Sequence, residues 1–325
     1  MTAPDGYPVR RDIVDRPGGA APPAPRAGSF LGDVLLGLSR PQKTLSPKYF
    51  YDLEGSRLFD EITRLPEYYP TRTELAILRD HGRALAHLIP PGAALLEFGS
   101  GSTEKIRILL RSAPNISTYV PIDVSGEFIE GEAARLRADL PDLEILPVVA
   151  DFAQTISLPP AMLDRPRVGF FPGSTIGNFE PEDAAALLRH FAQLLGPGSL
   201  LILGVDLVKA PEVLDAAYDD AAGVTARFNL NLLARINREL GADFDLAAFR
   251  HRAFFNRERS RIEMHLVSTR RQSVRLGGRL IRFESGETIH TENSYKFTRA
   301  SFAPLAARAG WDVAESFTDP AELFA

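Results

Sequence analysis

The chain has 325 residues, of which 45% are hydrophobic and 24% charged, and its formal net charge at pH 7 is −5. This is the composition of an ordinary globular protein, long enough for one large domain or two smaller ones. The lack of a basic block argues against a nucleic acid partner, and no apolar run reaches the 18 residues of a membrane helix. The chain has no cysteine, which excludes disulfides, thiolate metal sites and a cysteine nucleophile. We expect a cytoplasmic protein.

The N-terminal part contains a leader and two helical patterns. Residues 1–29 hold six prolines and four glycines and lack the apolar core of a signal peptide, so we predict a disordered leader. Apolar residues at helical spacing predict a helix over 53–65. Thr71 and Glu74 form a capping-box pattern ahead of a second helix that runs to about residue 88.

From residue 93 strands alternate with helices. We predict strands at 93–98, 117–122, 144–149, 168–171 and 199–205, and helices at 103–112, 126–138 and 182–195. Continuous apolar strands joined by helices predict an α/β fold, with a parallel sheet covered on both faces.

After residue 208 this alternation stops. Helical patterns at 211–220 and 222–240 precede β-like runs at "RIEMHLVS", "SVRL" and "TIHTENSYKF", and a helix at 300–309 and a strand at 312–317 follow. We therefore divide the chain into four parts. They are the leader (1–29), the N-terminal helices with the parallel sheet (30–208), an inserted α+β domain (209–298) and a return to the first domain (299–325).

The stretch "ALLEFGSGSTEKIRILL" predicts a cofactor site at the end of the first strand. Gly99 and Gly101 lie at the carboxyl end of a parallel strand, where open sheets bind ligands, and glycine lets the backbone approach a ligand closely. The third glycine of a dinucleotide fingerprint is replaced by Glu104, and Lys105 follows. A tight turn without a ligand is the alternative.

Two further turns indicate which cofactor is bound. Asp123 ends the second strand and could accept both ribose hydroxyls of NAD or of S-adenosylmethionine equally well. Asp151 and Phe152 follow the third strand, where an acid and an aromatic ring suit an adenine. The combination is that of a Class I methyltransferase with a Rossmann-like sheet, and it favours S-adenosylmethionine. Lys105 would then balance the methionine carboxylate, unless it is a solvated lysine.

Longer motifs carry a family resemblance. "SPKYFYDLEGSRLFDEITRLPEYYPTRTELAIL", "LEFGSGSTEK", "FFPGSTIGNF", "YDDAAGVTARFN" and "TENSYKF" occur in this order. Together they resemble the bacterial L-histidine Nα-methyltransferases, over roughly residues 40–320. The resemblance implies trimethylation of histidine to hercynine for ergothioneine synthesis, with histidine bound between the methyltransferase domain and the inserted domain. Members that resemble this chain continue after "TDP" into another apolar strand, so we expect a shortened edge strand here.

The resemblance also implies the residues that hold histidine. Methyl transfer to an amine depends mainly on alignment, so we look for positioning groups and not for a catalytic triad. The groups expected to act directly on the reacting amino acid are Tyr51, Asn178 and Tyr218, of which the last two would bind its carboxylate. The wider substrate site would comprise Tyr51, Phe59, Tyr68, Gly173, Thr175, Asn178, Tyr218, Met264, Glu292 and Ser294.

One of these pairs also has a geometric basis. Glu292 and Ser294 are two residues apart, so on a strand they face the same side. That spacing suits a ring with two nitrogens, and Met264 would pack against the ring as an adaptable apolar wall. The alternatives are an exposed polar strand face for the pair, core packing for Met264 and the aromatic residues, and a turn-forming role for Asn178.

The remaining expectations concern metals, partners and rival functions. The six histidines show no metal-ligand spacing, so we predict no metal site. We expect a monomer whose partner is the small molecule L-histidine, with no nucleic acid and no membrane. The rival functions are a methyltransferase of the same family that acts on another amino acid, an NAD-dependent oxidoreductase, and a non-catalytic ligand-binding protein on a methyltransferase scaffold.

Overall fold

The computed structural model describes residues 28–101, 103–162 and 164–325. Its helices, including short 3-10 turns named η, are α1 (Phe30–Leu38), η1 (Pro47–Tyr49), α2 (Leu53–Ile62), α3 (Tyr69–Leu88), α4 (Thr103–Ser112), α5 (Gly126–Asp139), η2 (Pro160–Met162), η3 (Thr175–Asn178), α6 (Pro181–Leu195), α7 (Pro211–Tyr218), α8 (Val224–Leu240), η4 (Leu246–Ala248) and α9 (Arg299–Arg308). Its strands are β1 (Lys43–Thr44), β2 (Ala93–Phe98), β3 (Ile116–Asp123), β4 (Glu144–Ile145), β5 (Val148–Val149), β6 (Arg167–Phe171), β7 (Leu200–Leu203), β8 (Phe249–Asn256), β9 (Arg261–Ser268), β10 (Gln272–Leu276), β11 (Arg279–Phe283) and β12 (Thr288–Tyr295).

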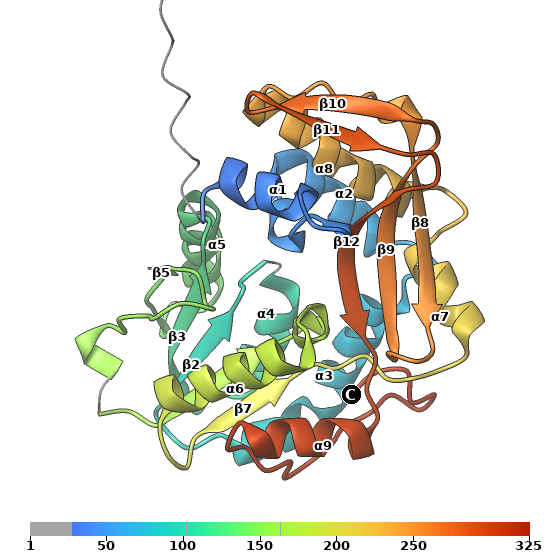
Figure 1. Ribbon diagram of the computed structural model, residues 1–325. Helices are drawn as coiled ribbons and strands as arrows, with labels where there is room; N and C mark the ends of the chain where they lie inside the picture. Colours follow the sequence, from blue (N-terminus) through green and yellow to red (C-terminus); the bar gives the residue numbers. More distant parts are fainter. Residues whose placement is uncertain (1–27, 102, 163) are drawn as a thin grey trace, which may run out of the picture.

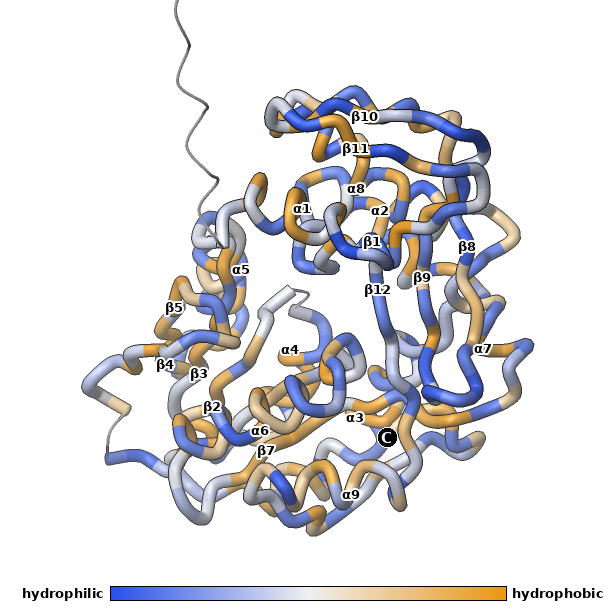
Figure 2. The backbone as a smooth tube through the Cα atoms, in the orientation of Figure 1, coloured by the Kyte–Doolittle hydropathy of each residue, from blue (hydrophilic) through white to orange (hydrophobic). Residues whose placement is uncertain are grey.

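A parallel sheet forms the first half of the molecule (Figure 1). Its strand order is β4-β3-β2-β6-β7, with β5 paired to β3. Every residue of β2 is buried, and β7 is hydrophobic along its length (Figure 2). One face packs on α3, α4 and α5, and the other on α6 and α9. The predicted α/β fold with a doubly covered parallel sheet is confirmed.

A mixed sheet forms the second half. Its order is β1-β12-β9-β8, in which β12, β9 and β8 are antiparallel neighbours and β1 runs parallel to β12. Helices α1, α2, α7 and α8 and the β10-β11 hairpin share one apolar core with this sheet. The segment before α3 therefore packs with residues that follow it by more than 150 positions, as Figure 1 shows for α1 and α2 beside α8.

Several sequence predictions were wrong in detail. The expected strand 144–149 is two short strands, because Pro147 has no N–H to donate to a ladder. Helix α3 begins at Tyr69, with Pro70 in its first turn, so Thr71 and Glu74 lie inside the helix and form no capping box. Neither α1 nor strands β1, β8 and β11 were predicted.

The C-terminal segment also differs from expectation. Residues 312–317 form no strand. They line a cavity of 630 Å³ together with residues of β7, and among the described strands β7 pairs only with β6. Further on, Ala325 and Val205 exchange two backbone hydrogen bonds of 2.8 and 2.9 Å.

The predicted leader lies outside the described residues apart from its last two. Ser29 caps α1 by accepting a hydrogen bond of 3.1 Å from the N–H of Gly32. Among the helices that the structure describes, none has the length and apolarity to cross a bilayer.

Candidate functional site

The glycine turn after β2 is shaped for close approach. Gly99 has a φ of +78°, which favours glycine, and its N–H donates to the carbonyl of Ile122 over 2.9 Å. A Cβ at this position would lie 3.3 Å from a ring carbon of Phe152. At Gly101 a Cβ would meet no atom within 4 Å. The turn therefore rests on Phe152 at its start and is open further along.

The two predicted acidic turns lie beside this loop. Strand β5 pairs with β3, and the N–H of Ala150 donates to the carbonyl of Asp123 over 2.9 Å. Each acid holds one carboxylate oxygen on its own turn, Asp123 on the N–H of Ser125 and Asp151 on that of Ala153, both at 2.9 Å. Burial raises the pKa of Asp123, although the Ser125 N–H opposes this. The structure thus brings the three predicted cofactor turns to one edge of the sheet.

Phe152 lies next to the first of these turns and packs on the core. Its ring centroid lies 5.5 Å from that of Phe171 and 6.4 Å from that of Phe191. The ring is therefore held by the core and could pack against a flat ligand placed at the turns.

Lys105 is not a solvated lysine. Its Nζ lies 2.5 Å from Oε2 of Glu74, and both side chains are largely buried. The same carboxylate accepts two hydrogen bonds from the N–H of Gly173, at 2.8 and 3.0 Å. Glu74 was missed because its spacing from Thr71 imitates a helix cap. This contact ties α3, α4 and the turn after β6 together.

A second buried acid lies at the end of β2. Glu97 is 1% exposed and accepts a hydrogen bond from the hydroxyl of Tyr119. Burial raises its pKa to about 7, although the hydroxyls of Tyr119 and Ser100 oppose this. It belongs to the "LEFGSG" stretch, but the sequence analysis assigned it no role.

The predicted aromatic residues form one cluster. Ring centroids are 5.6 Å apart for Tyr51 and Phe59, 6.3 Å for Phe59 and Tyr68, and 6.1 Å for Tyr68 and Tyr218. Phe228, which was not predicted, completes this aromatic cluster at 5.9 Å from Tyr51. Burial raises the pKa of each of the three tyrosines, so they are neutral phenols at physiological pH.

Strands β9 and β12 present the predicted imidazole contacts to this cluster. Glu292 pairs with Met264 and Ser294 with Ile262 in the antiparallel register, so all four side chains face one side of the sheet. Tyr218 and Ser294 share a hydrogen bond of 2.8 Å. Met264 is 1% exposed and belongs to the apolar core.

Among the polar side chains on this face, that of Glu292 makes the fewest hydrogen bonds. Its carboxylate makes no hydrogen bond to any residue that the structure describes. Burial raises its pKa to about 7, and the charge of Lys296 opposes this only in part. A carboxyl held in this way is suited to pair with a nitrogen base.

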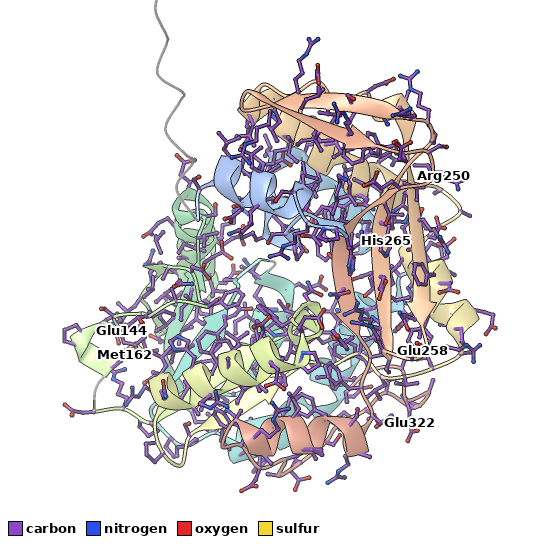
Figure 3. All side chains as sticks on the ribbon, viewed as in Figure 1. Glu144, Met162, Arg250, Glu258, His265 and Glu322 are labelled. Atoms are coloured by element: carbon purple, nitrogen blue, oxygen red, sulfur yellow. The ribbon has the colours of Figure 1, made fainter. Side chains whose placement is uncertain are left out.

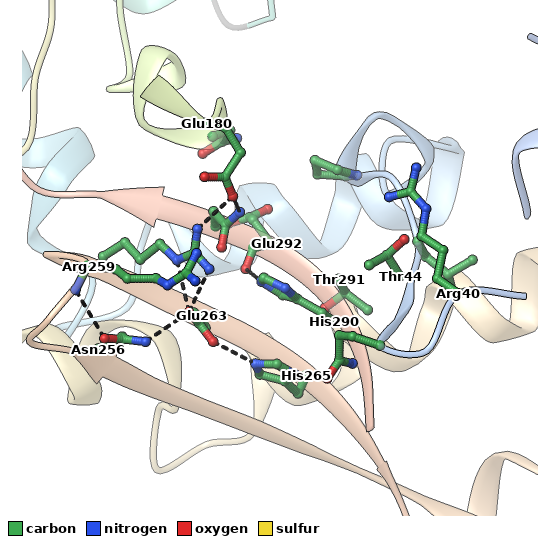
Figure 4. Close-up of a pocket in the computed structure, with 16 residues that line it drawn as sticks. Arg40, Thr44, Glu180, Asn256, Arg259, Glu263, His265, His290, Thr291 and Glu292 are labelled. Carbon is green, nitrogen blue, oxygen red and sulfur yellow. Dashed lines mark hydrogen bonds and ion pairs between the residues drawn. The ribbon is translucent and has the colours of Figure 1, made fainter. Parts of the chain in front are cut away.

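The turn after β6 lies across from β12. Gly173 and Ser174 have φ values of +79° and +56°, and Thr175 donates its hydroxyl to the carbonyl of Pro172 over 2.9 Å. Asn178 ends the turn and lines a cavity of 570 Å³ together with Glu292 (Figure 4). The Thr175 hydroxyl is thus engaged locally, whereas Asn178 belongs to the cavity wall.

Behind the aromatic cluster lies a buried network that the sequence analysis missed. Lys296 is 2% exposed, and its Nζ lies 2.9 Å from the Tyr218 hydroxyl, 2.8 Å from that of Ser294 and 2.8 Å from Asp206. Asp206 also accepts from the hydroxyl of Tyr69 at 2.8 Å and from Lys209 at 2.6 Å. Two signals were present, since Lys296 belongs to "TENSYKF" and Asp206 interrupts an apolar run.

The opposite face of β9 and β12 carries a polar cluster that lines the same 570 Å³ cavity as Asn178 and Glu292 (Figures 3 and 4). Glu263, His265 and His290 bring one ligand atom each within 4.8 Å of the others. The two imidazoles stack at 4.6 Å with 18° between their planes, so their nitrogen lone pairs do not converge on one point. Burial lowers the pKa of His265 to about 4. The predicted lack of a metal remains a prediction.

Comparison with known proteins gives the family. The sequence profile of the histidine-specific, S-adenosylmethionine-dependent methyltransferases matches residues 30–325. The chain belongs to this family. A histidine N-alpha-methyltransferase of Mycolicibacterium smegmatis is 45% identical over 90% of this chain and 92% of its own length. One of Mycobacterium tuberculosis is 43% identical with the same coverage.

A longer relative is the ergothioneine biosynthesis protein 1 of Neurospora crassa. It is 30% identical over 82% of this chain, which spans 31% of that protein. The parallel sheet is accordingly the Rossmann-like sheet of a Class I methyltransferase, and membership of the family makes this chain an S-adenosylmethionine-dependent enzyme.

Proposed function

We propose that the protein trimethylates the α-nitrogen of L-histidine to form hercynine, as the first step of ergothioneine biosynthesis. The observation that carries the proposal is the common face of Glu292, Ser294 and Met264 beside the aromatic cluster. An acid, a hydroxyl and an apolar wall in this arrangement complement an imidazole. The names of the relatives with 43–45% identity support the same substrate.

The cofactor site fits S-adenosylmethionine. Gly99 and Gly101 provide the close backbone approach, Asp123 an acceptor for the ribose, and Asp151 with Phe152 the adenine contacts. Bound S-adenosylmethionine supplies an electrophilic methyl group on its sulfonium. Lys105 would lie near the methionine carboxylate, and its charge is shared with Glu74.

The protein's contribution to the reaction is alignment and exclusion of water. The amine attacks as a free base, so the ammonium loses one proton before each transfer, and three transfers release three protons. Tyr51 is a neutral phenol at physiological pH, since the ordinary pKa of a tyrosine is about 10, so it would accept a hydrogen bond from the amine without removing its proton. Gly173 and Thr175 line the amine site with small groups, which leaves room for added methyl groups.

The substrate carboxylate would bind the Asn178 amide and the Tyr218 hydroxyl, with Phe59 and Tyr68 enclosing the side chain. Residues 209–298, together with the N-terminal helices, would act as the substrate-binding domain and 299–325 as part of the methyltransferase domain. We further propose a monomer that works in the cytoplasm on this small molecule alone.

The test is incubation with excess S-adenosylmethionine and each amino acid, followed by mass spectrometry. We expect histidine alone to gain one, two and finally three methyl groups, all on the α-nitrogen. Monomethylhistidine as the end product, ring methylation, or faster turnover of another amino acid would contradict the proposal. A parallel binding assay with NAD tests the oxidoreductase alternative, which requires that the protein binds NAD.

A further inference from the structure

The ammonium group of Lys296 uses all of its donors inside the protein. It has three N–H groups and three acceptors at 2.8–2.9 Å, which are the hydroxyl oxygens of Tyr218 and Ser294 and a carboxylate oxygen of Asp206. The side chain is fully buried. Lys296 therefore makes no contact with solvent and has no N–H left for a substrate.

The two hydroxyl oxygens are held against each other by this lysine. They lie 2.8 Å apart, a distance at which one must donate its proton to the other, because two lone pairs facing each other would repel. Each oxygen also accepts a hydrogen bond from Lys296. One of the two hydroxyl protons is therefore engaged in the hydrogen bond between Tyr218 and Ser294. Only the other hydroxyl proton can be donated to a ligand.

We propose that Lys296 is a positioning residue that holds these two hydroxyls at hydrogen-bonding distance, so that, once Tyr218 donates to the substrate carboxylate, Ser294 can only accept from the imidazole. With an anionic carboxylate at Tyr218, the free proton must lie on Tyr218. Ser294 then donates to Tyr218 and presents a lone pair to the ring. This inference rests on the proposed function, since it assumes histidine in the site.

The consequence is a proton count for the bound ring. The ring nitrogen that faces Ser294 must carry a proton, because Ser294 can only accept. The hydrogen bond between the other ring nitrogen and Glu292 needs a second proton, which either the nitrogen or the carboxylate holds. A neutral imidazole beside an ionised Glu292 has only one proton. Binding must therefore take up one proton when both partners start in those forms.

The surroundings of Glu292 support retention of this extra proton. The groups that face it are Tyr51, Tyr68 and Tyr218, all neutral phenols, and Lys296, whose charge is balanced by Asp206. Burial already raises the pKa of Glu292 to about 7 without a ligand. A cationic or proton-sharing partner is accordingly favoured there over a neutral one.

The test uses the wild-type protein saturated with S-adenosylhomocysteine, and Nα-trimethylhistidine as the ligand. This ligand has a permanent charge and no proton on its α-nitrogen, so only its ring and the protein can exchange protons. Calorimetric titration at pH 8 in buffers of different ionisation enthalpy measures the protons taken up. We expect about one per site, because the free imidazole is neutral well above its ordinary pKa of about 6.5. Uptake of less than half a proton overturns the inference.

Single substitutions test which residues the proton uptake depends on. In Lys296→Met the two oxygens can separate, Ser294 can donate to a neutral ring, and proton uptake should fall below half. Lys209→Met is the matched control, because Lys209 is also buried on Asp206 but touches neither hydroxyl, and it should keep the wild-type uptake. Ser294→Ala removes the acceptor and should likewise lower the uptake.

The outcomes separate the two proposals. If Lys296→Met does not fold, Lys296→Gln takes its place, because glutamine keeps polar groups in the network but cannot donate to both hydroxyls and Asp206 as an ammonium does, and proton uptake should again fall below half; the wild-type and Ser294→Ala titrations test the proton count. Unchanged uptake in folded Lys296→Met would overturn the role of this lysine. If the wild-type protein neither methylates histidine nor binds Nα-trimethylhistidine, the proposed function fails; if it does both without proton uptake, only this inference fails.

Discussion

At the scale of single residues, the site is built from acids whose ionisation the fold controls in different ways. Asp123 and Asp151 each hold one oxygen on a backbone N–H and keep the other for a ligand. Glu74 is neutralised by Lys105. Glu292 has no such partner, and burial raises its pKa. We therefore propose separate roles for these carboxylates, in cofactor binding, in structure and in substrate selection.

Asp123→Ala should weaken S-adenosylmethionine binding. A hydrogen bond to a charged acceptor contributes about 1.5–3 kcal/mol, which corresponds to an affinity loss of about 10- to 150-fold. Calorimetry with the cofactor measures this directly. Asp142→Ala, an exposed aspartate in the turn after α5, is the control and should bind normally. Equal affinities for both variants would place the ribose elsewhere.

Glu292→Ala should relax the selectivity for histidine more than it affects the cofactor. The imidazole loses its charged partner, so kcat/KM for histidine should fall by at least about tenfold. Analogues without a second ring nitrogen should lose much less, because a site stripped of a buried polar group no longer penalises them. Wild-type kcat/KM for histidine in this variant would refute the assignment.

Glu292→Gln should stabilise the protein, increasingly so at higher pH. The folded-state pKa of Glu292 is raised from 4.5 to about 7, so the folded protein loses stability relative to the unfolded chain as pH rises between these values. Glutamine cannot ionise and avoids this loss. The Tm difference from wild type should therefore be small at pH 4.5 and largest above pH 7. Glu258→Gln, at an exposed position, should show no such trend.

At the scale of elements, the decisive contact is that of η3 with β12. The turn after β6 presses its backbone onto the strand that carries the imidazole contacts, and a Cβ on Gly177 would lie 2.8 Å from the carbonyl oxygen of Tyr295. Because Gly177 precedes Asn178 directly, the packing of this turn sets where the carboxylate-binding amide lies relative to Glu292. The spacing of the two substrate contacts thus depends on a backbone contact.

Gly177→Ala should disturb this spacing. The φ of Gly177 is not positive, so the effect is steric, and overpacking of this kind typically costs about 1–3 kcal/mol. We expect a lower Tm and a higher KM for histidine, with cofactor affinity nearly unchanged. Gly131→Ala in α5 is the control, since its Cβ would meet no atom within 4 Å and alanine favours the helix. A kinetic profile like that of wild type would show that η3 tolerates displacement.

At the scale of the whole molecule, Glu180 joins the two halves. It precedes α6 of the methyltransferase part and accepts hydrogen bonds from Arg261 at 2.6 Å, Asn293 at 3.0 Å and Tyr295 at 2.6 Å, all from the mixed sheet. We propose that the substrate binds between these halves. Their relative position is held in part by the carboxylate of Glu180, which lines the 570 Å³ cavity with Asn178 and Glu292 but is not one of the proposed substrate contacts.

Glu180→Ala should loosen the joint without altering any proposed contact. Since the carboxylate is partly exposed, we expect a modest effect of ~1 kcal/mol, or about a fivefold rise in KM for histidine. Faster hydrogen exchange in β12 should accompany it. Glu182→Ala, two residues on, removes only a surface pair with Arg308 and should change neither quantity. If the two variants have the same KM for histidine and the same hydrogen exchange in β12, Glu180 does not hold the two halves together.

The sequence by itself determined the parallel sheet, the cofactor turns and the family, because these depend on local order: apolar strands, glycines at strand ends and acids after them. Only the tertiary structure decided the network of Lys296 and Asp206, the pairing of Glu74 with Lys105 and the tie through Glu180. Each of these joins residues from about 30 to 115 positions apart, and whether a charged residue is buried with a partner or exposed to water cannot be read from its neighbours in the chain. The same holds for residues 312–317, whose strand-like pattern lacked a partner at hydrogen-bonding distance.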